Sequence, residues 1–220
     1  MEAPSGRTRV RREPEHGVYD RAVIDAVLDE GLVAHLGVVG DGGQPYVLPV
    51  GYGRAGDGVL VHGSSASRLF RLAAEGAPAC LTVTLLDGVV LARSTFSSTM
   101  NYRSVVVLGE AVAITGEDEK LAALRTLSER LAPGHFDYSR PPTAQELKAT
   151  TVLRLPLTES SAKVRVGPPH DDADDQALPL WAGVVPLTLV AGAPEPDPAV
   201  PAGHEVPPHV REWAQRRSRS

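Results

Sequence analysis

The sequence predicts a mainly β protein of the α+β class, in which six or more antiparallel strands and a few short helices form a barrel. Glycine (21) and proline (19) are both frequent among the 220 residues, whereas aromatic residues make up only 5%. This composition favours many short elements joined by turns. Apolar and β-branched segments also recur along the chain between turn-forming residues, as expected for antiparallel strands.

Individual elements follow from the local patterns. Residues 19–30 have apolar side chains at helical spacing, with Asp20 able to cap the start and Gly31 beyond the end. Turn sequences at 40–43 and at Asp87–Gly88 each lie between apolar segments, which predicts two β-hairpins. Helices are predicted over 19–30, 68–75 and 117–131. Strands are predicted over 32–39, 44–52, 59–62, 79–86, 89–94, 103–115, 151–157 and 162–167.

The chain is expected to hold one domain, over residues 18–191. The basic composition of residues 1–17 predicts a flexible N-terminal extension, and the many prolines of residues 192–220 predict a partly disordered tail. A net charge of −5 argues against nucleic acid as a partner, and no apolar run approaches the roughly 20 residues that cross a bilayer. Without an apolar stretch after the first arginines, no export signal is expected, so we expect a cytoplasmic protein with no membrane partner.

The segment His62–Arg68 has the components of a phosphate site. Three hydroxyl side chains, a glycine and the Arg68 guanidinium follow a predicted strand. Hydroxyl groups donate to phosphate oxygens, and a guanidinium matches phosphate geometry with two bonds. A serine-rich turn with a solvated arginine explains the same residues about as well.

Two further polar segments could hold an anion. Tyr102, Arg103 and Ser104 precede an apolar strand. In the last strand, alternation places Lys163 and Arg165 on the same face. A strand entrance and a charged edge strand are the alternative interpretations.

His35 is expected to be a core histidine, so only His62 is a candidate proton donor. His170 and the aspartates after it are expected to form a solvated loop, and no metal site is predicted.

Five segments in order carry a family resemblance: Tyr19–Ala22, His62–Arg68, Asp87–Ser94, Met100–Gly109 and Ala162–Pro169. Over about residues 17–190 they resemble the pyridoxamine-phosphate-oxidase-like FMN-binding split barrels, in the flavin-nucleotide-binding branch related to nitroimidazole-resistance proteins. The resemblance implies a six-stranded antiparallel split β-barrel, and a homodimer with FMN sites at the subunit interface. The cofactor-binding residues it implies, together with the segments above, are Tyr46, Val47, Leu48, Pro49, His62, Ser64, Ser65, Ser67, Arg68, Tyr102, Arg103, Ser104 and Lys163.

The implied function is that of an FMN-dependent oxidoreductase acting on a small molecule, with His62 as proton donor. The C-terminal tryptophan–arginine signature of true pyridoxamine-phosphate oxidases is not found, which argues against vitamin B6 oxidation. The alternative is a non-enzymatic flavin or haem carrier or a redox sensor. Relatives with this barrel bind haem or a deazaflavin coenzyme in place of FMN, and FAD is a further candidate.

Overall fold

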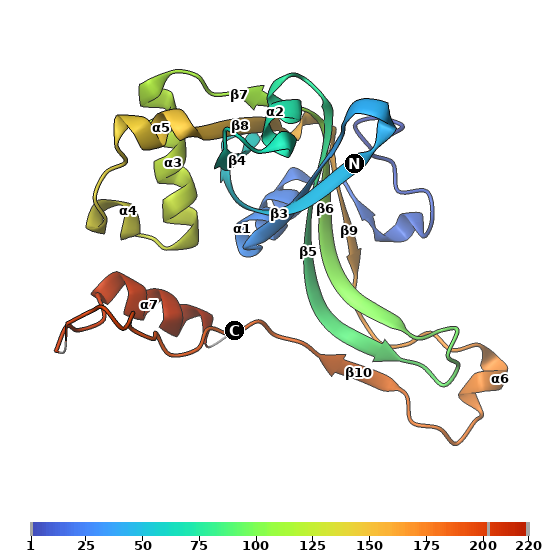
Figure 1. The fold of residues 1–220 in the computed structure, drawn as a ribbon. Coiled ribbons are helices and arrows are strands. Elements are labelled where there is room, and N and C mark those ends of the chain that lie inside the picture. The colour runs from blue at the N-terminus through green and yellow to red at the C-terminus, as the bar shows by residue number, and fades with distance from the viewer. Residues whose placement is uncertain (1, 202, 219–220) are drawn as a thin grey trace.

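The computed structural model describes residues 2–201 and 203–218. Helices separate groups of consecutive strands along the chain (Figure 1). The helices are α1 (Arg21–Glu30), α2 (Arg68–Ala74), α3 (Glu117–Leu131), α4 (His135–Tyr138), α5 (Ala144–Ala149), α6 (Ala173–Gln176) and α7 (Pro208–Arg217). The strands are β1 (Gly17–Val18), β2 (Val33–Val39), β3 (Pro45–Ala55), β4 (Gly58–Ser64), β5 (Pro78–Leu91), β6 (Thr99–Glu110), β7 (Val112–Ala113), β8 (Thr150–Pro156), β9 (Ser160–Arg165) and β10 (Gly183–Pro186).

The strands form one curved antiparallel sheet with a few helices around it, as in a split barrel. Its order is β1-β9-β6-β5-β2-β3-β4-β8-β7, and β10 pairs with β5. The predicted mainly β class is confirmed, but the described sheet has ten strands instead of six. Seven of the ten strands are six residues long or longer, and the other three, β1, β7 and β10, have only two to four residues. Segments this short carry no readable alternation, so pairing with long neighbours defines them.

The second predicted hairpin is wrong. Residues 78–91 form one continuous strand, β5, and Asp87 lies at a register shift between Leu86 and Gly88. The Asp87 carboxylate accepts hydrogen bonds from Arg103 of β6 at 2.7 and 2.9 Å. The turn-like Asp-Gly sequence therefore makes a β-bulge, a local irregularity that bends a strand without reversing it.

The three predicted helices are confirmed. Asp20 caps α1 by accepting a hydrogen bond from the backbone N–H of Ala22 at 2.8 Å. Helix α3 spans the predicted 117–131, but its buried face carries Ala123 and Leu127, while Leu121 and Leu131 are exposed. The helix packs by the narrow stripe that faces β3 and β4.

The apolar core lies inside the barrel. Inward-facing side chains of β2, β3, β4, β5, β6 and β8 pack against α1 and α2, and the largest of them are fully buried. Tyr52 is among them, and its hydroxyl donates to the carbonyl oxygens of Leu28 and Gly31 at 2.6 and 3.0 Å. This desolvated environment raises the pKa of Tyr52 to about 12.

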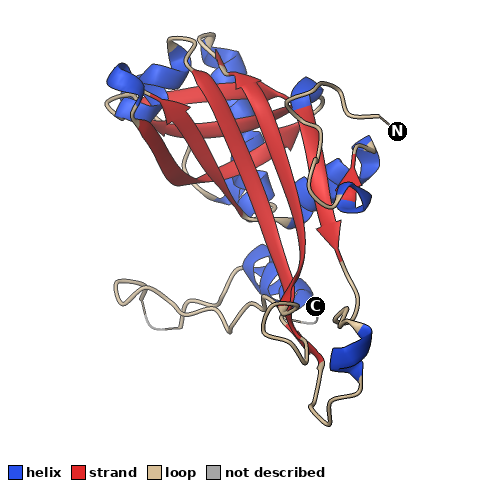
Figure 2. Cartoon of the chain, turned by 90° about the vertical axis from the view of Figure 1, so that its right-hand side faces the viewer, coloured by secondary structure: helices blue, strands red, loops and turns tan. Residues whose placement is uncertain are grey.

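A long projection, which we call the arm, extends away from the barrel (Figures 1 and 2). It consists of residues 86–102 and 166–190, and so includes the outer ends of β5 and β6 together with α6 and β10. Asp171 is held there by Arg93 in a 2.9 Å ion pair, with its side chain almost fully buried. The prediction of a solvated loop is therefore wrong at Asp171.

The two terminal segments contact the rest of the chain. Thr8 is buried, and the backbone N–H of Val10 donates to the hydroxyl of Tyr19 at 2.8 Å. At the other end, helix α7 was not predicted, and its His209 lies 3.1 Å from His135 of α4. Because prolines are frequent just before α7, the spacing of its few apolar residues did not indicate a helix.

Candidate functional site

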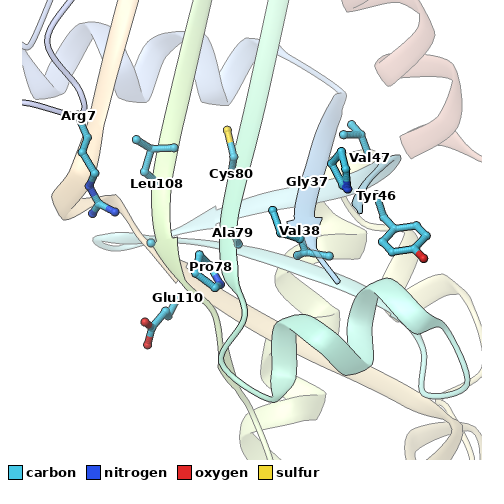
Figure 3. A pocket seen from close by; sticks show the side chains of 13 residues that line it. Arg7, Gly37, Val38, Tyr46, Val47, Pro78, Ala79, Cys80, Leu108 and Glu110 are labelled. Carbon is cyan, nitrogen blue, oxygen red and sulfur yellow. The ribbon is translucent and has the colours of Figure 1, made fainter. Parts of the chain in front are cut away.

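An apolar pocket of about 670 Å³ lies on the outer face of the sheet (Figure 3). Its floor is a row of residues from four neighbouring strands. The register sets Val47 of β3 opposite Gly37, Gly37 opposite Cys80 of β5, and Cys80 opposite Leu108 of β6. Val47 remains 60% exposed, so the floor offers its apolar surface to a ligand. The row suits the flat face of an aromatic ring system.

A polar pocket of about 400 Å³ adjoins the apolar pocket, because Tyr46 lines both. Arg68 and Arg71 of α2 line it together with the carboxylates of Asp41 and Glu75. The guanidinium of Arg68 donates to the Tyr46 hydroxyl at 2.8 Å and lies 5.3 Å from the centre of its ring. An apolar surface and a pair of guanidinium groups are thus joined through one tyrosine.

The predicted serine-rich loop connects β4 to α2 beside this polar pocket. Its backbone is fixed by hydrogen bonds from Ser65 N–H to the Ala149 carbonyl and from Ser67 N–H to the Ser64 carbonyl, both 2.9 Å. The Ser67 hydroxyl makes no capping bond to α2, which leaves it available to a ligand. Gly63 is required here, because a Cβ would lie 2.3 Å from the ring of Phe70.

The two histidines of the barrel share the outer face. His62 of β4 is opposite Val152 of β8; its side chain is exposed, but partial desolvation of the ring lowers its pKa, which favours the neutral form. His35 was expected in the core, but it is exposed on β2, since the alternation of that strand turns Ala34 and Leu36 inward. Both imidazoles are therefore accessible from outside the barrel.

The predicted residues on β6 and β9 form a separate group. Strands β5 and β2 lie between β6 and β3, so within one chain Tyr102, Arg103, Ser104 and Lys163 are remote from Arg68. Ser104 is paired with Lys163 across the β6–β9 ladder. Tyr102 and Ser104 have the same parity on β6 as Leu108, so they share the outer sheet face with the apolar pocket.

Arg103 has the opposite parity, and its guanidinium is fully engaged within the chain. It pairs with Asp87 at 2.7 Å and with Glu30, and these hydrogen bonds raise its pKa further. Lys163 pairs with Glu13 at 3.3 Å. The guanidinium of Arg165, predicted to share a face with Lys163, is buried against Asn101 and the Pro168 carbonyl. The ion pairs of Arg103 and the hydrogen bonds of the buried Arg165 make both residues poor candidates for binding a cofactor.

Several pocket residues were not predicted from the sequence, Arg71, Cys80, Arg7 and Glu110 among them. Arg71 follows Arg68 by three residues, which places both on one helix face, and this spacing was a usable signal. Cys80 has the apolar neighbours Ala79 and Leu81, which predict a buried structural thiol, but it is half-buried in the pocket floor. Arg7 and Glu110 line the pocket from distant parts of the chain, and no local pattern announces them.

The fold and site describe a β-barrel protein with an outer pocket suited to an aromatic, phosphate-bearing ligand. The family model of pyridoxamine 5'-phosphate oxidase matches residues 20–164, and the chain belongs to this family. No curated protein matches the sequence.

Within the described residues, no helix is both long and apolar enough to cross a membrane. The same residues contain no cluster of three or more His, Cys, Asp or Glu side chains that could bind a metal ion.

Solved structures extend this likeness to almost the full chain. The flavocytochrome Anf3 from Azotobacter vinelandii is 43% identical with a TM-score of 0.91, over 96% of this chain and 98% of that one. The FAD and heme binding protein from Mycobacterium smegmatis is 42% identical with a TM-score of 0.86, over 90% and 97%. A proposed 5-nitroimidazole antibiotic resistance protein from Bacteroides thetaiotaomicron shares the fold, at 20% identity and a TM-score of 0.54, over 67% and 86%.

Proposed function

We propose that this protein is a flavin-binding oxidoreductase that acts on a small molecule. The observation that carries the proposal is the continuity, through Tyr46, of an apolar pocket with a polar pocket that holds Arg68 and Arg71. A flavin nucleotide has the same division, because a flat, largely apolar ring system is joined to a phosphate. The residues present therefore fit the cofactor of the proposal.

Each chain residue would have a defined part in holding the flavin. Arg68 and Arg71 would neutralise the phosphate, and the free hydroxyl of Ser67 would donate to one of its oxygens. The strand segment 46–49 would lie along the ring. A bound flavin supplies hydride or electron transfer, and the protein supplies binding and electrostatics. His62, whose lowered pKa favours the neutral ring, would hold a proton only transiently.

The identity of the flavin is a finer part of the proposal. The sequence resemblance favours FMN, whereas one relative at 42% identity is an FAD and heme binding protein. FMN and FAD share the ring and the first phosphate, so the same arginines serve either. Mass spectrometry of the small molecule that heat releases from the purified protein distinguishes the two by mass.

We also propose a homodimer that packs through the outer sheet face. Val33, Val39 and Val47 are exposed on this face around the apolar pocket, and a contiguous exposed apolar surface marks an interaction site. Since Ser104 and Lys163 share that face, a second copy can bring them to the pocket that one chain alone leaves open. Release of flavin upon dilution to monomer supports a shared site, and a monomer that retains flavin contradicts it.

A second candidate function is haem binding, with the protein acting as a carrier or redox sensor. Two relatives above 40% identity are a flavocytochrome and an FAD and heme binding protein. The plausible nitrogen donors are His62, His35 and the histidines of the tail, and His62 of β4 and the exposed His35 of β2 lie on the outer face with strand β3 between their strands. A Soret band that is lost in His62→Ala or His35→Ala supports this role, and its absence after haem addition contradicts it.

The first test is flavin affinity in Arg68→Ala. Loss of a charge-assisted phosphate contact is expected to weaken binding by about 1.5–3 kcal/mol, measured by fluorescence titration of the full chain. Arg211→Ala, an exposed arginine on α7, is the matched control and should bind as the wild type does. If Arg68→Ala binds flavin with the wild-type affinity, Arg68 does not bind the phosphate and the proposed phosphate site is wrong.

A further inference from the structure

The two ends of the apolar pocket differ in chemistry. Tyr46 stands at the end that joins the polar pocket, while Arg7 and Glu110 stand at the opposite end (Figure 3). Everything between them is apolar or glycine. A ligand that lies along the pocket therefore meets one guanidinium and one carboxylate at its far edge.

Arg7 reaches this position because the N-terminal segment is fixed to the barrel. Thr8 is buried, Ser5 bonds to the Glu159 carboxylate and to the backbone N–H of Arg7, and Glu13 pairs with Lys163 of β9. These contacts come before and after Arg7 in the chain. The segment is thereby part of the pocket wall, which gives the arginine-bearing N-terminus a role that its sequence did not suggest.

Both polar groups at the far edge can still bind a ligand. The Arg7 side chain is 66% exposed and touches only Glu159, at 3.4 Å. An exposed pair of this kind contributes at most about 1 kcal/mol, so a ligand can compete for the guanidinium. Over the described ranges 2–201 and 203–218, no ion pair joins Arg7 to Glu110 or engages the Glu110 carboxylate elsewhere. The edge thus offers strong donors beside a free acceptor.

We propose that Arg7 and Glu110 recognise the imide edge of the flavin ring, which is a carbonyl, an N–H and a second carbonyl in a row. Arg7 donates to a ring carbonyl oxygen, and the Glu110 carboxylate accepts from the ring N3–H. This inference rests on the proposed flavin site. It fixes the direction of the ligand: the imide edge lies at Arg7 and Glu110, and the ribityl-phosphate chain, which leaves the ring system from N10 of the central ring, extends toward Tyr46 and Arg68. A simple anion does not fit as well, because Glu110 would repel it.

The experiment compares two ligands, FMN and N3-methyl-FMN, in which the imide hydrogen is replaced. Both are titrated into the full chain after bound cofactor is stripped, and ring fluorescence reports the dissociation constant. The wild type should bind N3-methyl-FMN at least tenfold more weakly. Glu110→Ala should bind the two ligands with affinities within about twofold, since it has lost the acceptor that distinguishes them.

Two arginine variants complete the test. Arg7→Ala should weaken both ligands by about fivefold or more while it keeps the preference for FMN, because Arg7 contacts a carbonyl that both ligands have. Arg9→Ala removes an exposed arginine that does not line the pocket and should behave as the wild type. Thermal melts of the apo-proteins confirm that each variant is folded.

The outcomes separate this inference from the proposed function. A wild type that binds FMN but accepts N3-methyl-FMN equally well overturns the imide contact and leaves the flavin proposal standing. A preference for FMN that persists in Glu110→Ala also overturns it. A wild type that binds neither ligand overturns both proposals.

Discussion

The barrel and the arm share the two long strands β5 and β6, but apolar side chains are buried in the barrel and exposed in the arm. Inside the barrel, Leu81, Val83, Val105 and Val107 are fully buried under α1 and α2. In the arm, Phe96 is 94% exposed and Trp181 is 68% exposed. The strands leave their own core part of the way along their length, as Figure 2 shows.

The difference makes the arm a candidate surface for association. Ribbons of a few strands gain stability only when one face is covered, and exposed apolar groups of this size mark binding surfaces. Leu178, Leu180 and Met100 add to the apolar tip around Phe96 and Trp181. The barrel should therefore determine stability, and the arm should strengthen the association that we propose for the outer sheet face.

The largest expected effect tests the barrel side of this comparison. Leu81→Ala removes a fully buried side chain and leaves a cavity, so the free energy of unfolding should fall by about 2–5 kcal/mol. Leu189→Ala, at a residue 75% exposed, should change it by less than about 0.5 kcal/mol. Urea unfolding followed by circular dichroism measures both. Similar losses in the two variants would erase the distinction.

The second prediction concerns the arm. The double variant Phe96→Asp with Trp181→Asp places charges on the apolar tip and should weaken the proposed dimer at least tenfold, at unchanged flavin affinity per folded dimer. Sedimentation equilibrium gives the dissociation constant. Val112→Asp is the matched control, because Val112 is exposed on the short strand β7 of the barrel. A dimer as tight as that of the wild type shows that the tip is not part of the interface.

The smallest effect is the pH dependence contributed by His62. Burial lowers its pKa in the folded state, so the unfolded chain binds the proton more readily. The stabilisation is therefore complete above the unfolded pKa of about 6.5 and is lost as the pH falls through the lower folded value. His62→Gln should flatten the acid side of the stability profile, as followed by urea midpoints between pH 5 and 7.5. A variant with the wild-type slope in that range would contradict the assignment.

Local signals allowed the sequence to predict α1, α3 and the hairpin of β2 and β3 with small errors at their ends. Those elements are defined by caps, by helical spacing and by a turn, all of which act over a few residues. The Asp87–Gly88 pair shows the limit of this reasoning, because the same turn chemistry also makes a bulge. Only the pairing of β6 along the whole of β5 decides between them.

The candidate site divides in the same way. The sequence by itself determined the class of fold, the serine-rich loop with Arg68 and the aromatic Tyr46 beside it, because these residues are close in the chain or follow a recognisable order. Only the tertiary structure decided that Arg103 forms ion pairs with Glu30 and Asp87. It also decided that His35 faces outward and that Arg7 and Glu110 line the same pocket. The physical reason is that strand parity, ion pairing and the approach of a distant segment depend on which surfaces meet, and no window of sequence contains that information.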